Sequence, residues 1–300
     1  KFFILFIIIF STSGIILTSE TVIPQFRFNQ LLKKAIFLSW VLPDNISFPI
    51  IRIAAFTFLF FFGIDYQLYM NFEKTLISGE LIKRYKRFFV DVKINNKVIT
   101  AHCPNTGSMM GLLDNGNKVW LSKTDQPNRK LKYTLQIIES QKSKVGVNTH
   151  LTNKIVLESL KNNLVNKFKN YKNIQKEVKF GNDTRFDFLI SKNKKKTFIE
   201  VKNVTLSRKK GIAEFPDSVT TRGLKHINEL LKAGSNGYTI YLFFVIQRDD
   251  CNKFKIASDI DAEYGKVITK AVKKNLNILC YDCKISPKGI KLNREIKLEM

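Results

Sequence analysis

Thr184–Lys202, TRFDFLISKNKKKTFIEVK, is the stretch of this 300-residue sequence from which the fold is best argued. Apolar and polar residues alternate on both sides of a polar break, Ser191–Lys196, and this period-two pattern predicts a β-hairpin. If the hairpin is symmetric about the middle of the break, Asp187 lies opposite Glu200, with Cβ atoms roughly 5 Å apart. Lys202 lies on the same face as Glu200, because side chains two residues apart share a face of a strand.

Two facing carboxylates among apolar residues are unfavourable, because like charges repel and a buried charge costs several kcal/mol when it is not compensated. A divalent cation provides compensation, since Mg²⁺ binds one or two carboxylates together with water and phosphate oxygens. We therefore predict that Asp187 and Glu200 hold Mg²⁺ or Mn²⁺, and that Lys202 acts on the attacking water or the scissile phosphate. The alternative is a surface hairpin whose acids pair with nearby lysines.

Blocks of sequence in a fixed order carry a resemblance to known proteins. They are HCPNTGSM (His102–Met109), PNRKLKYTL (Pro127–Leu135), VGVNT (Val145–Thr149), RFDFL (Arg185–Leu189), FIEVKNVTL (Phe198–Leu206) and FPDSVTTRGLKHINEL (Phe215–Leu230). In these blocks the chain from about Met70 to Leu292 resembles the sugar fermentation stimulation protein family of prokaryotes. The hairpin resembles the D…ExK core of the PD-(D/E)XK nuclease fold. The resemblance implies an N-terminal OB-like β-barrel, a C-terminal nuclease-like α/β domain and nucleic-acid binding.

Residues 150–168 are predicted to form a helix, because apolar side chains recur there at helical spacing. Glu158 lies along the apolar stripe, in line with Leu151 and Ile155. On periodicity alone, Glu158 is a residue at the rim of the stripe whose carboxylate reaches water. The nuclease fold commonly carries an acidic residue on the helix before the hairpin, so the resemblance implies that Glu158 assists the two hairpin carboxylates at the metal site.

The formal net charge of +25 concerns the partners of the protein rather than its fold. Nucleic acid, either DNA or RNA, is the simplest acidic partner, and an anionic membrane surface is the next. The length suffices for two domains with packed cores. We therefore predict an α+β protein with an OB-like nucleic-acid-binding domain over residues 70–146 and a PD-(D/E)XK nuclease-like domain over residues 147–300, preceded by a hydrophobic extension over residues 1–69.

The extension differs from the rest of the chain in composition. Neither of its apolar runs, KFFILFIIIF and Ile50–Gly63, is a comfortable membrane span, which needs about twenty apolar residues. It holds five Lys or Arg against three Asp or Glu, so +23 of the +25 belongs to residues 70–300. Met70, the first methionine, stands where the resemblance begins. We interpret residues 1–69 as upstream sequence translated in frame, with a membrane anchor as the alternative; a membrane partner depends on these residues being genuine.

Residues 70–146 contain several short strands separated by Gly, Pro and Asn, including a turn at Asn95-Asn96, which predicts a small barrel or sandwich. OB barrels bind strands of nucleic acid through basic grooves and aromatic faces. The candidate phosphate contacts in this domain are Lys83, Arg84, Lys86, Arg87, Arg129 and Lys130. Each taken singly is better explained as an ordinary solvated side chain, but as a set they predict contacts that follow a phosphate backbone.

The candidate phosphate contacts of the second domain are Arg208, Lys209, Lys210, Arg222 and Lys225. The first three form a basic loop. The last two lie on a helix predicted over residues 218–233, which the resemblance places beside the acids, where they clamp phosphate. His226 on this helix is interpreted as a packing or hydrogen-bonding residue. The apolar run Tyr238–Ile246 predicts a central strand covered on both faces.

The four cysteines bear on the redox state of the cellular compartment in which the protein works. Cys280 and Cys283 form a C-x-x-C that suggests zinc, but Cys103 and Cys251 do not form a second such pair, and residues 278–284 have the pattern of a strand. We interpret all four as structural thiols in a reducing cytoplasm.

Functions from different classes account for these features. The first is a Mg²⁺- or Mn²⁺-dependent nuclease that hydrolyses phosphodiesters in DNA or RNA. The second is a non-catalytic DNA-binding regulator of sugar metabolism genes, as the family name suggests. A third, a basic protein anchored in a membrane, depends on residues 1–69. All of them fit the basic charge, but only the nuclease explains acids aligned on one face of a hairpin.

Overall fold

The computed structural model describes residues 70–181 and 184–299 in full and residues 2–11 and 14–24 as backbone. It divides the chain into two compact units, Lys1–Gln67 and Leu68–Met300. In the first unit, β1 (Phe2–Ser11) and β2 (Gly14–Pro24) pair antiparallel. The second apolar run, Ile50–Gly63, lies outside the described residues. Within the described part of the chain, no helix combines the length and the apolarity needed to cross a membrane.

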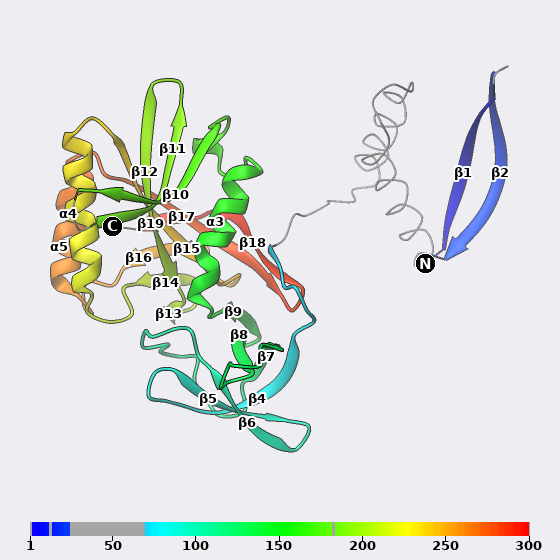
Figure 1. Ribbon diagram of the computed structural model, residues 1–300, viewed down its shortest axis with the longest axis horizontal. Coiled ribbons are helices and arrows are strands. Elements are labelled where there is room, and N and C mark those ends of the chain that lie inside the picture. The colour runs from blue at the N-terminus through cyan, green and yellow to red at the C-terminus, as the bar shows by residue number, and fades with distance from the viewer. Residues whose placement is uncertain (1, 12–13, 25–69, 182–183, 300) are drawn as a thin grey trace. The chain divides into compact units, whose positions relative to one another are not determined.

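The predicted barrel forms the N-terminal part of the second unit (Figure 1). Its strands are β4 (Ile77–Tyr85), β5 (Phe89–Ile94), β6 (Lys97–His102), β7 (Lys118–Lys123) and β8 (Tyr133–Ser140), with β9 (Ser143–Gly146) added to β8. The strand order is β6-β5-β4-β7-β8, and pairing of β6 with β8 at His102 and Thr134 closes a five-stranded barrel. Asn95 and Asn96 both have positive φ, as a two-residue turn with the right-handed twist of a hairpin requires.

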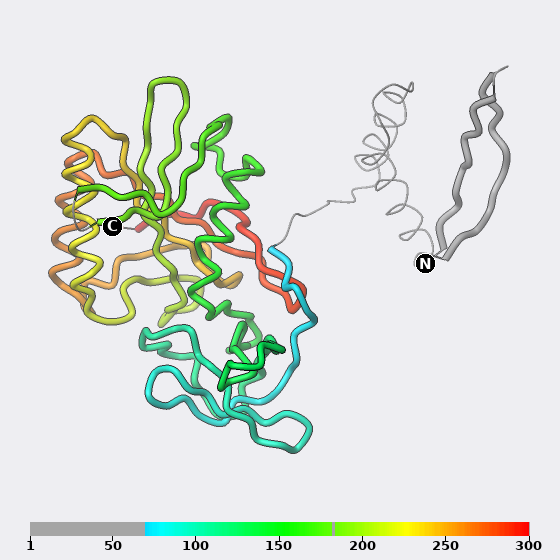
Figure 2. Tube along the Cα trace, viewed as in Figure 1, coloured from blue at the N-terminus to red at the C-terminus, as the bar shows by residue number. Residues whose placement is uncertain are grey.

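The rest of the unit is an α/β domain built on a seven-stranded sheet of order β10-β11-β12-β15-β17-β18-β3. Its middle strands β12, β15 and β17 run parallel. The strands are β10 (Asn173–Phe180), β11 (Thr184–Lys192), β12 (Lys195–Val204), β15 (Thr239–Ile246), β17 (Asn277–Ser286), β18 (Gly289–Glu295) and β3 (Met70–Asn71). A small second sheet contains β13 (Leu206–Lys209), β14 (Ile212–Phe215), β16 (Lys253–Ile256) and β19 (Lys297–Glu299). Figure 2 shows β3, at the start of the unit, beside the C-terminal strand β18.

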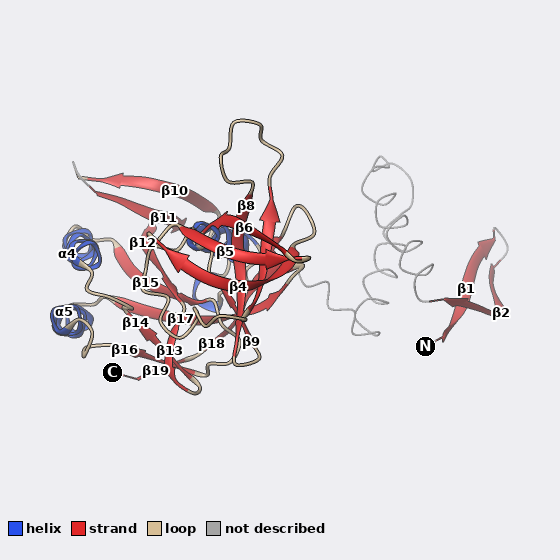
Figure 3. Ribbon diagram, turned by 90° about the horizontal axis from the view of Figure 1, so that it is seen from below, coloured by secondary structure: helices blue, strands red, loops and turns tan. Residues whose placement is uncertain are grey.

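Helices cover both faces of the large sheet (Figure 3). On one face lies α3 (Thr152–Lys161), and on the other lie α4 (Thr221–Ser235) and α5 (Ala262–Lys273), which contact each other. Strand β15 alternates between the two cores: Phe243 and Val245 pack on the side of α3, and Leu242 and Phe244 pack under α4 and α5. This confirms the central strand predicted from the apolar run.

The first helix is shorter than predicted. Short 3₁₀ turns at Thr149–Leu151 and Asn166–Phe168 flank α3, which ends at Lys161. Asn163 has φ +54, a left-handed conformation that does not continue an α-helix. The apolar spacing therefore extends through a segment whose backbone turns, because the residues that pack on the sheet come from both the helix and the turn that follows it.

The barrel and the α/β domain share a core. Trp120 and Ile137 of the barrel belong to the same buried cluster as Phe188 and Val245 of the large sheet. At the junction the backbone N–H of Gly146 donates to the carbonyl oxygen of Gln247 over 2.9 Å. The two domains are thus packed together rather than joined by a bare linker.

Candidate active site

The hairpin of β11 and β12 has the predicted register. Facing residues run from Phe188 and Ile199 to Lys192 and Lys195 around the turn. The ladder ends just before the two acids, and Oδ2 of Asp187 accepts a hydrogen bond from the backbone N–H of Val201 over 2.7 Å. Asp187 and Glu200 are therefore neighbours, but they are not the directly facing ladder pair that symmetry predicts.

A change in β11 explains why the ladder ends there. Phe186 packs in the core under α4 and α5, whereas Phe188 packs in the core under α3. Two residues this far apart share a face on a regular strand, so the alternation is broken at Asp187. On the neighbouring strand β10, Lys176 pairs with Phe188 and Val178 pairs with Phe186. Glu177 lies between these two pairs and has φ +51. The irregularity in β10 and β11 allows the carboxylate of Asp187 to reach the backbone of β12.

Asp187 is held by a residue of α3. Its Oδ1 accepts a hydrogen bond from Nδ2 of Asn153 over 2.7 Å. Burial and the nearby carboxylate of Glu200 raise the pKa of Asp187 to about 6, although the hydrogen bonds and Lys202 oppose this rise. The raised pKa indicates that positive charge at this point is insufficient for two ionised acids.

Glu200 is only 3% exposed, and its two carboxylate oxygens differ in their hydrogen-bond partners. Its Oε1 accepts a hydrogen bond from Nζ of Lys202 over 2.7 Å and contacts Nδ1 of His226 on α4. Burial raises the pKa of Glu200, but Lys202 and His226 outweigh burial, so the pKa is lowered and the group is ionised. Its Oε2 is buried and has no hydrogen-bond partner among the described residues.

Two basic side chains, Lys202 and Arg222, approach the two ring nitrogens of His226. Nζ of Lys202 lies 3.3 Å from Nδ1 of His226, and Nε of Arg222 lies 3.4 Å from Nε2 of the same ring. His226 therefore connects Glu200 to an exposed arginine one turn earlier on α4. The structure thus gives His226 contacts beyond packing, and it brings the predicted residue Arg222 to the edge of the cluster.

The donor set fits a hard divalent cation. Asp187 and Glu200 supply carboxylate oxygens, and Oε2 of Glu200 has a free acceptor position. Mg²⁺ and Mn²⁺ sites need only one or two carboxylates when water and phosphate complete the shell. Within the described residues, no group of three or more His, Cys, Asp or Glu is arranged to bind a metal. The site therefore does not have the closed ligand set of structural zinc.

Glu158 does not join the pair. Burial raises its pKa, and the charge that acts on it is that of Lys154. The residue of α3 that contacts Asp187 is Asn153, which the sequence analysis did not single out. A search for polar residues near the start of the helix would have found it, whereas the apolar stripe leads to Glu158.

Two of the predicted phosphate contacts bind protein groups instead. The guanidinium of Arg84 donates to the carbonyl oxygens of Arg87, Asn105 and Ser108. Arg208 forms ion pairs with Glu214 over 2.7 Å and with Asp259 over 2.5 Å. Both guanidinium groups therefore have protein acceptors, and phosphate binding by either arginine stays a prediction.

The other predicted basic residues lie at the surface. Arg129 is half-buried and donates to Oγ1 of Thr134 over 2.6 Å. The exposed ones are Lys83, Lys86, Arg87, Lys130, Lys209, Lys210, Arg222 and Lys225. They lie on β4 and the β4–β5 turn, the β7–β8 loop, the end of β13 and the β13–β14 turn, and α4.

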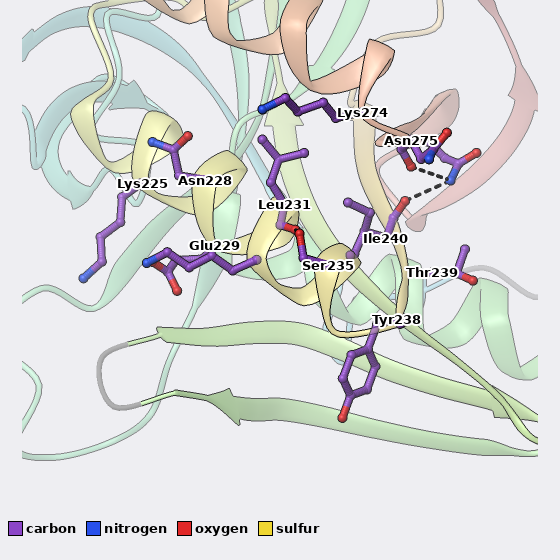
Figure 4. Close-up of a pocket in the computed structure, with 14 residues that line it drawn as sticks. Lys225, Asn228, Glu229, Leu231, Ser235, Tyr238, Thr239, Ile240, Lys274 and Asn275 are labelled. Atoms are coloured by element: carbon purple, nitrogen blue, oxygen red, sulfur yellow. Dashed lines mark hydrogen bonds and ion pairs between the residues drawn. The ribbon is translucent and has the colours of Figure 1, made fainter.

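A cleft of about 1000 Å³ opens beside the C-terminal half of α4 and the start of β15 (Figure 4). Its lining includes Lys225, Tyr238 and Lys274. Asp187, Glu200 and Lys202 are not in the lining. Of the predicted site residues, only Lys225 lines this cleft, and the acid cluster is not part of it.

The barrel and the acid-bearing sheet define a class of protein, an OB domain followed by an α/β domain. The family model described as "SfsA N-terminal OB domain" matches residues 82–147, and the one described as "Sugar fermentation stimulation protein RE domain" matches residues 150–289. The chain belongs to the sugar fermentation stimulation protein family.

Relatives agree with this assignment. A sugar fermentation stimulation protein homologue of Pelagibacter ubique strain HTCC1062 is 57% identical over 229 residues, which are 76% of this chain and 99% of the relative. One of Maricaulis maris strain MCS10 is 39% identical over 233 residues, 77% of this chain and 99% of the relative. The structure of Pyrococcus furiosus SfsA in complex with Ca²⁺ has the same fold, with a TM-score of 0.70 at 23% identity, over 77% of this chain and 98% of that one.

Proposed function

We propose that the protein is a metal-dependent nuclease that hydrolyses phosphodiesters in DNA or RNA in the cytoplasm. The observation that carries this proposal is the arrangement of Asp187, Glu200 and Lys202. Two acids lie together, Glu200 buried and Asp187 partly buried. The pKa of Asp187 is raised, and Glu200 has a buried oxygen without a partner among the described residues. A structural ion pair needs no such deficit of positive charge, whereas a cation site does.

Asp187 and Glu200 would hold Mg²⁺ or Mn²⁺. When bound, the metal would supply a Lewis acid that polarises the phosphoryl oxygen and lowers the pKa of a bound water. The Pyrococcus furiosus protein of the same fold was crystallised in complex with Ca²⁺, another hard cation that prefers oxygen ligands.

The chain's own residues supply the remaining functions. Lys202 is held against Oε1 of Glu200 at 2.7 Å, where its ammonium can orient a water or neutralise charge on the scissile phosphate. His226 holds the same oxygen and leaves Oε2 to the cation. Arg222 is exposed beside His226 and is placed to contact an adjacent phosphate.

The test is a cleavage screen with the purified full chain on single- and double-stranded DNA and RNA. We expect Mn²⁺ or Mg²⁺ to stimulate cleavage and excess EDTA to abolish it. Glu200→Gln, Lys202→Ala and Asp187→Asn should each lower the rate by at least about 100-fold while binding in EDTA persists. Glu229→Gln is the matched control, because this α4 residue pairs with Lys232 rather than with the acid cluster, and it should retain the rate.

Glu158→Gln tests the remaining predicted carboxylate, and we expect at most a partial loss. Tight binding on every substrate without metal-stimulated cleavage would contradict the proposal. That result would leave the non-catalytic DNA-binding regulator as the function of this chain.

A further inference from the structure

The turn between β4 and β5 holds an aromatic ring in solvent. Phe88 is 48% exposed, although most large apolar side chains of the barrel are buried. The two preceding residues, Lys86 and Arg87, both have positive φ, which is uncommon outside glycine. Arg84 stabilises this turn by donating to the carbonyl oxygen of Arg87 over 3.0 Å. The exposed ring is therefore carried by a turn of defined conformation.

Basic and aromatic groups lie on the same turn and on the two strands that it joins. Tyr85 and Phe89 stack with ring centroids 5.5 Å apart, and Nζ of Lys83 lies 5.8 Å from the centroid of Tyr85. Lys86 and Arg87 are exposed on the turn itself. In OB barrels the loop between the first two strands and the loop between the last two bind oligonucleotides. The β4–β5 and β7–β8 loops are the equivalents here.

Hydrogen bonds connect the turn to the segments that precede α3 and α4 through the loop Cys103–Met110, which we call the junction loop. The backbone N–H of Cys103 donates to the carbonyl oxygen of Phe88 over 2.7 Å, and Arg84 donates to that of Asn105 over 2.8 Å. At its other side, Oγ1 of Thr149 donates to the carbonyl oxygen of Pro104 over 3.0 Å.

The junction loop also contacts the segment before α4. The backbone N–H of Met109 lies 3.5 Å from Oδ2 of Asp217. The loop thus touches the segments that lead into α3, which carries Asn153, and into α4, which carries Arg222 and His226. The junction loop therefore links the β4–β5 turn to the segments that lead into the two helices that carry these residues.

The acids themselves are recessed. Glu200 is 3% exposed, and Lys202 and His226 are each 13% exposed. A duplex presents its phosphates on a stiff rod and hides the faces of its bases, whereas a single strand bends and exposes them. Aromatic platforms in basic surroundings bind single strands because every base has a face that stacks.

We propose that the substrate is a single-stranded nucleic acid whose bases stack on Phe88 as the strand passes from the barrel to the acid cluster. The passage of the strand to the acid cluster rests on the proposed function, but base stacking on Phe88 can be measured without cleavage. It commits to a single strand because positive charge alone would bind duplex and single strand alike.

The test measures binding by fluorescence anisotropy in EDTA, with a fluorescein-labelled oligothymidylate and with a labelled duplex. Phe88→Ala should weaken binding of the single strand about 10- to 100-fold, the loss expected for one stacked base. It should change duplex affinity less than 2-fold and leave the salt dependence unaltered, because no charge is removed. Phe88→Trp should restore binding.

Leu164→Ala is the matched control, because Leu164 is 41% exposed on the α/β domain and should leave both affinities unchanged. Circular dichroism should show that each variant is folded. An equal loss for duplex and single strand, or no loss for either, would overturn the inference. Since metal is absent from the assay, that result is independent of whether the chain cleaves nucleic acid.

Discussion

At the scale of single residues, the two acids of the site differ because their partners differ. Glu200 has a lysine and a histidine on one oxygen, and these lower its pKa despite burial. Asp187 has only neutral donors, Asn153 and the N–H of Val201, and burial beside Glu200 raises its pKa to about 6. Asp187 is therefore the group whose proton a cation must displace.

This difference predicts how metal binding depends on pH. Since the folded-state pKa of Asp187 lies above its ordinary value of 3.8, the folded protein keeps a proton between about pH 4 and 6 that the unfolded chain has lost. The contribution of Asp187 to stability should fall as pH rises through that window. Mn²⁺ affinity should rise about tenfold per pH unit up to about pH 6 and level off above it. Calorimetric Mn²⁺ titrations from pH 5 to 8 measure this dependence.

Two variants control that experiment. Asn153→Ala removes a donor to ionised Asp187, so the midpoint should move up by about one pH unit. Asn228→Ala, an exposed residue of α4, should leave the midpoint in place. A Mn²⁺ affinity that does not vary between pH 5 and 7 would show that Asp187 is already ionised in the free protein.

At the scale of elements, the sequence predicts what depends on near neighbours. The register of the β11–β12 hairpin follows from the symmetry of a local pattern, and it is confirmed up to Phe188 and Ile199. The end of the ladder at Asp187 depends on β10, where Glu177 has positive φ, and no local pattern contains that information. Asn153 is likewise brought to Asp187 by helix packing across a separation of 34 residues.

Strand β3 shows the same limit. It precedes the barrel in the sequence but pairs with β18 at the edge of the large sheet. Met70 of this strand is 2% exposed and packs in the core beside α3. The α/β domain therefore takes one strand from the N-terminal side of the barrel, although the sequence predicts the two domains as consecutive segments.

We expect Met70→Ala to lower the free energy of unfolding by about 2–5 kcal/mol, because it leaves a cavity in the shared core. Met110→Ala is the matched control: Met110 is 49% exposed on the junction loop, so the change should stay within about 0.5 kcal/mol. Urea denaturation of the full chain measures both. Equal effects for the two variants would mean that β3 contributes little to the domain.

At the scale of the whole molecule, the question is whether barrel and α/β domain behave as one body. Trp120 and Ile137 of the barrel are buried in the core of the large sheet. The guanidinium of Arg248, which is 6% exposed, donates to the carbonyl oxygen of Thr205, and its backbone bridges to Val145 of β9. A nucleic-acid strand bound to the barrel would then keep a fixed position relative to Asp187 and Glu200.

This packing predicts that the two domains unfold in one transition. In a Trp40→Phe background, Trp120 is the only tryptophan of the chain and its fluorescence reports the barrel. The far-UV dichroism of α3, α4 and α5 reports the α/β domain.

Ile138 is buried in the barrel core alone, whereas its neighbour Ile137 is buried in the shared core. Each change to Ala should lower the free energy of unfolding by about 2–5 kcal/mol. Because the domains unfold together, the midpoints of the fluorescence and the dichroism signals should fall by the same amount. If Ile138→Ala moved the fluorescence midpoint and left the helical signal where it was, the domains would be independent, and a strand bound to the barrel would have no fixed path to Glu200.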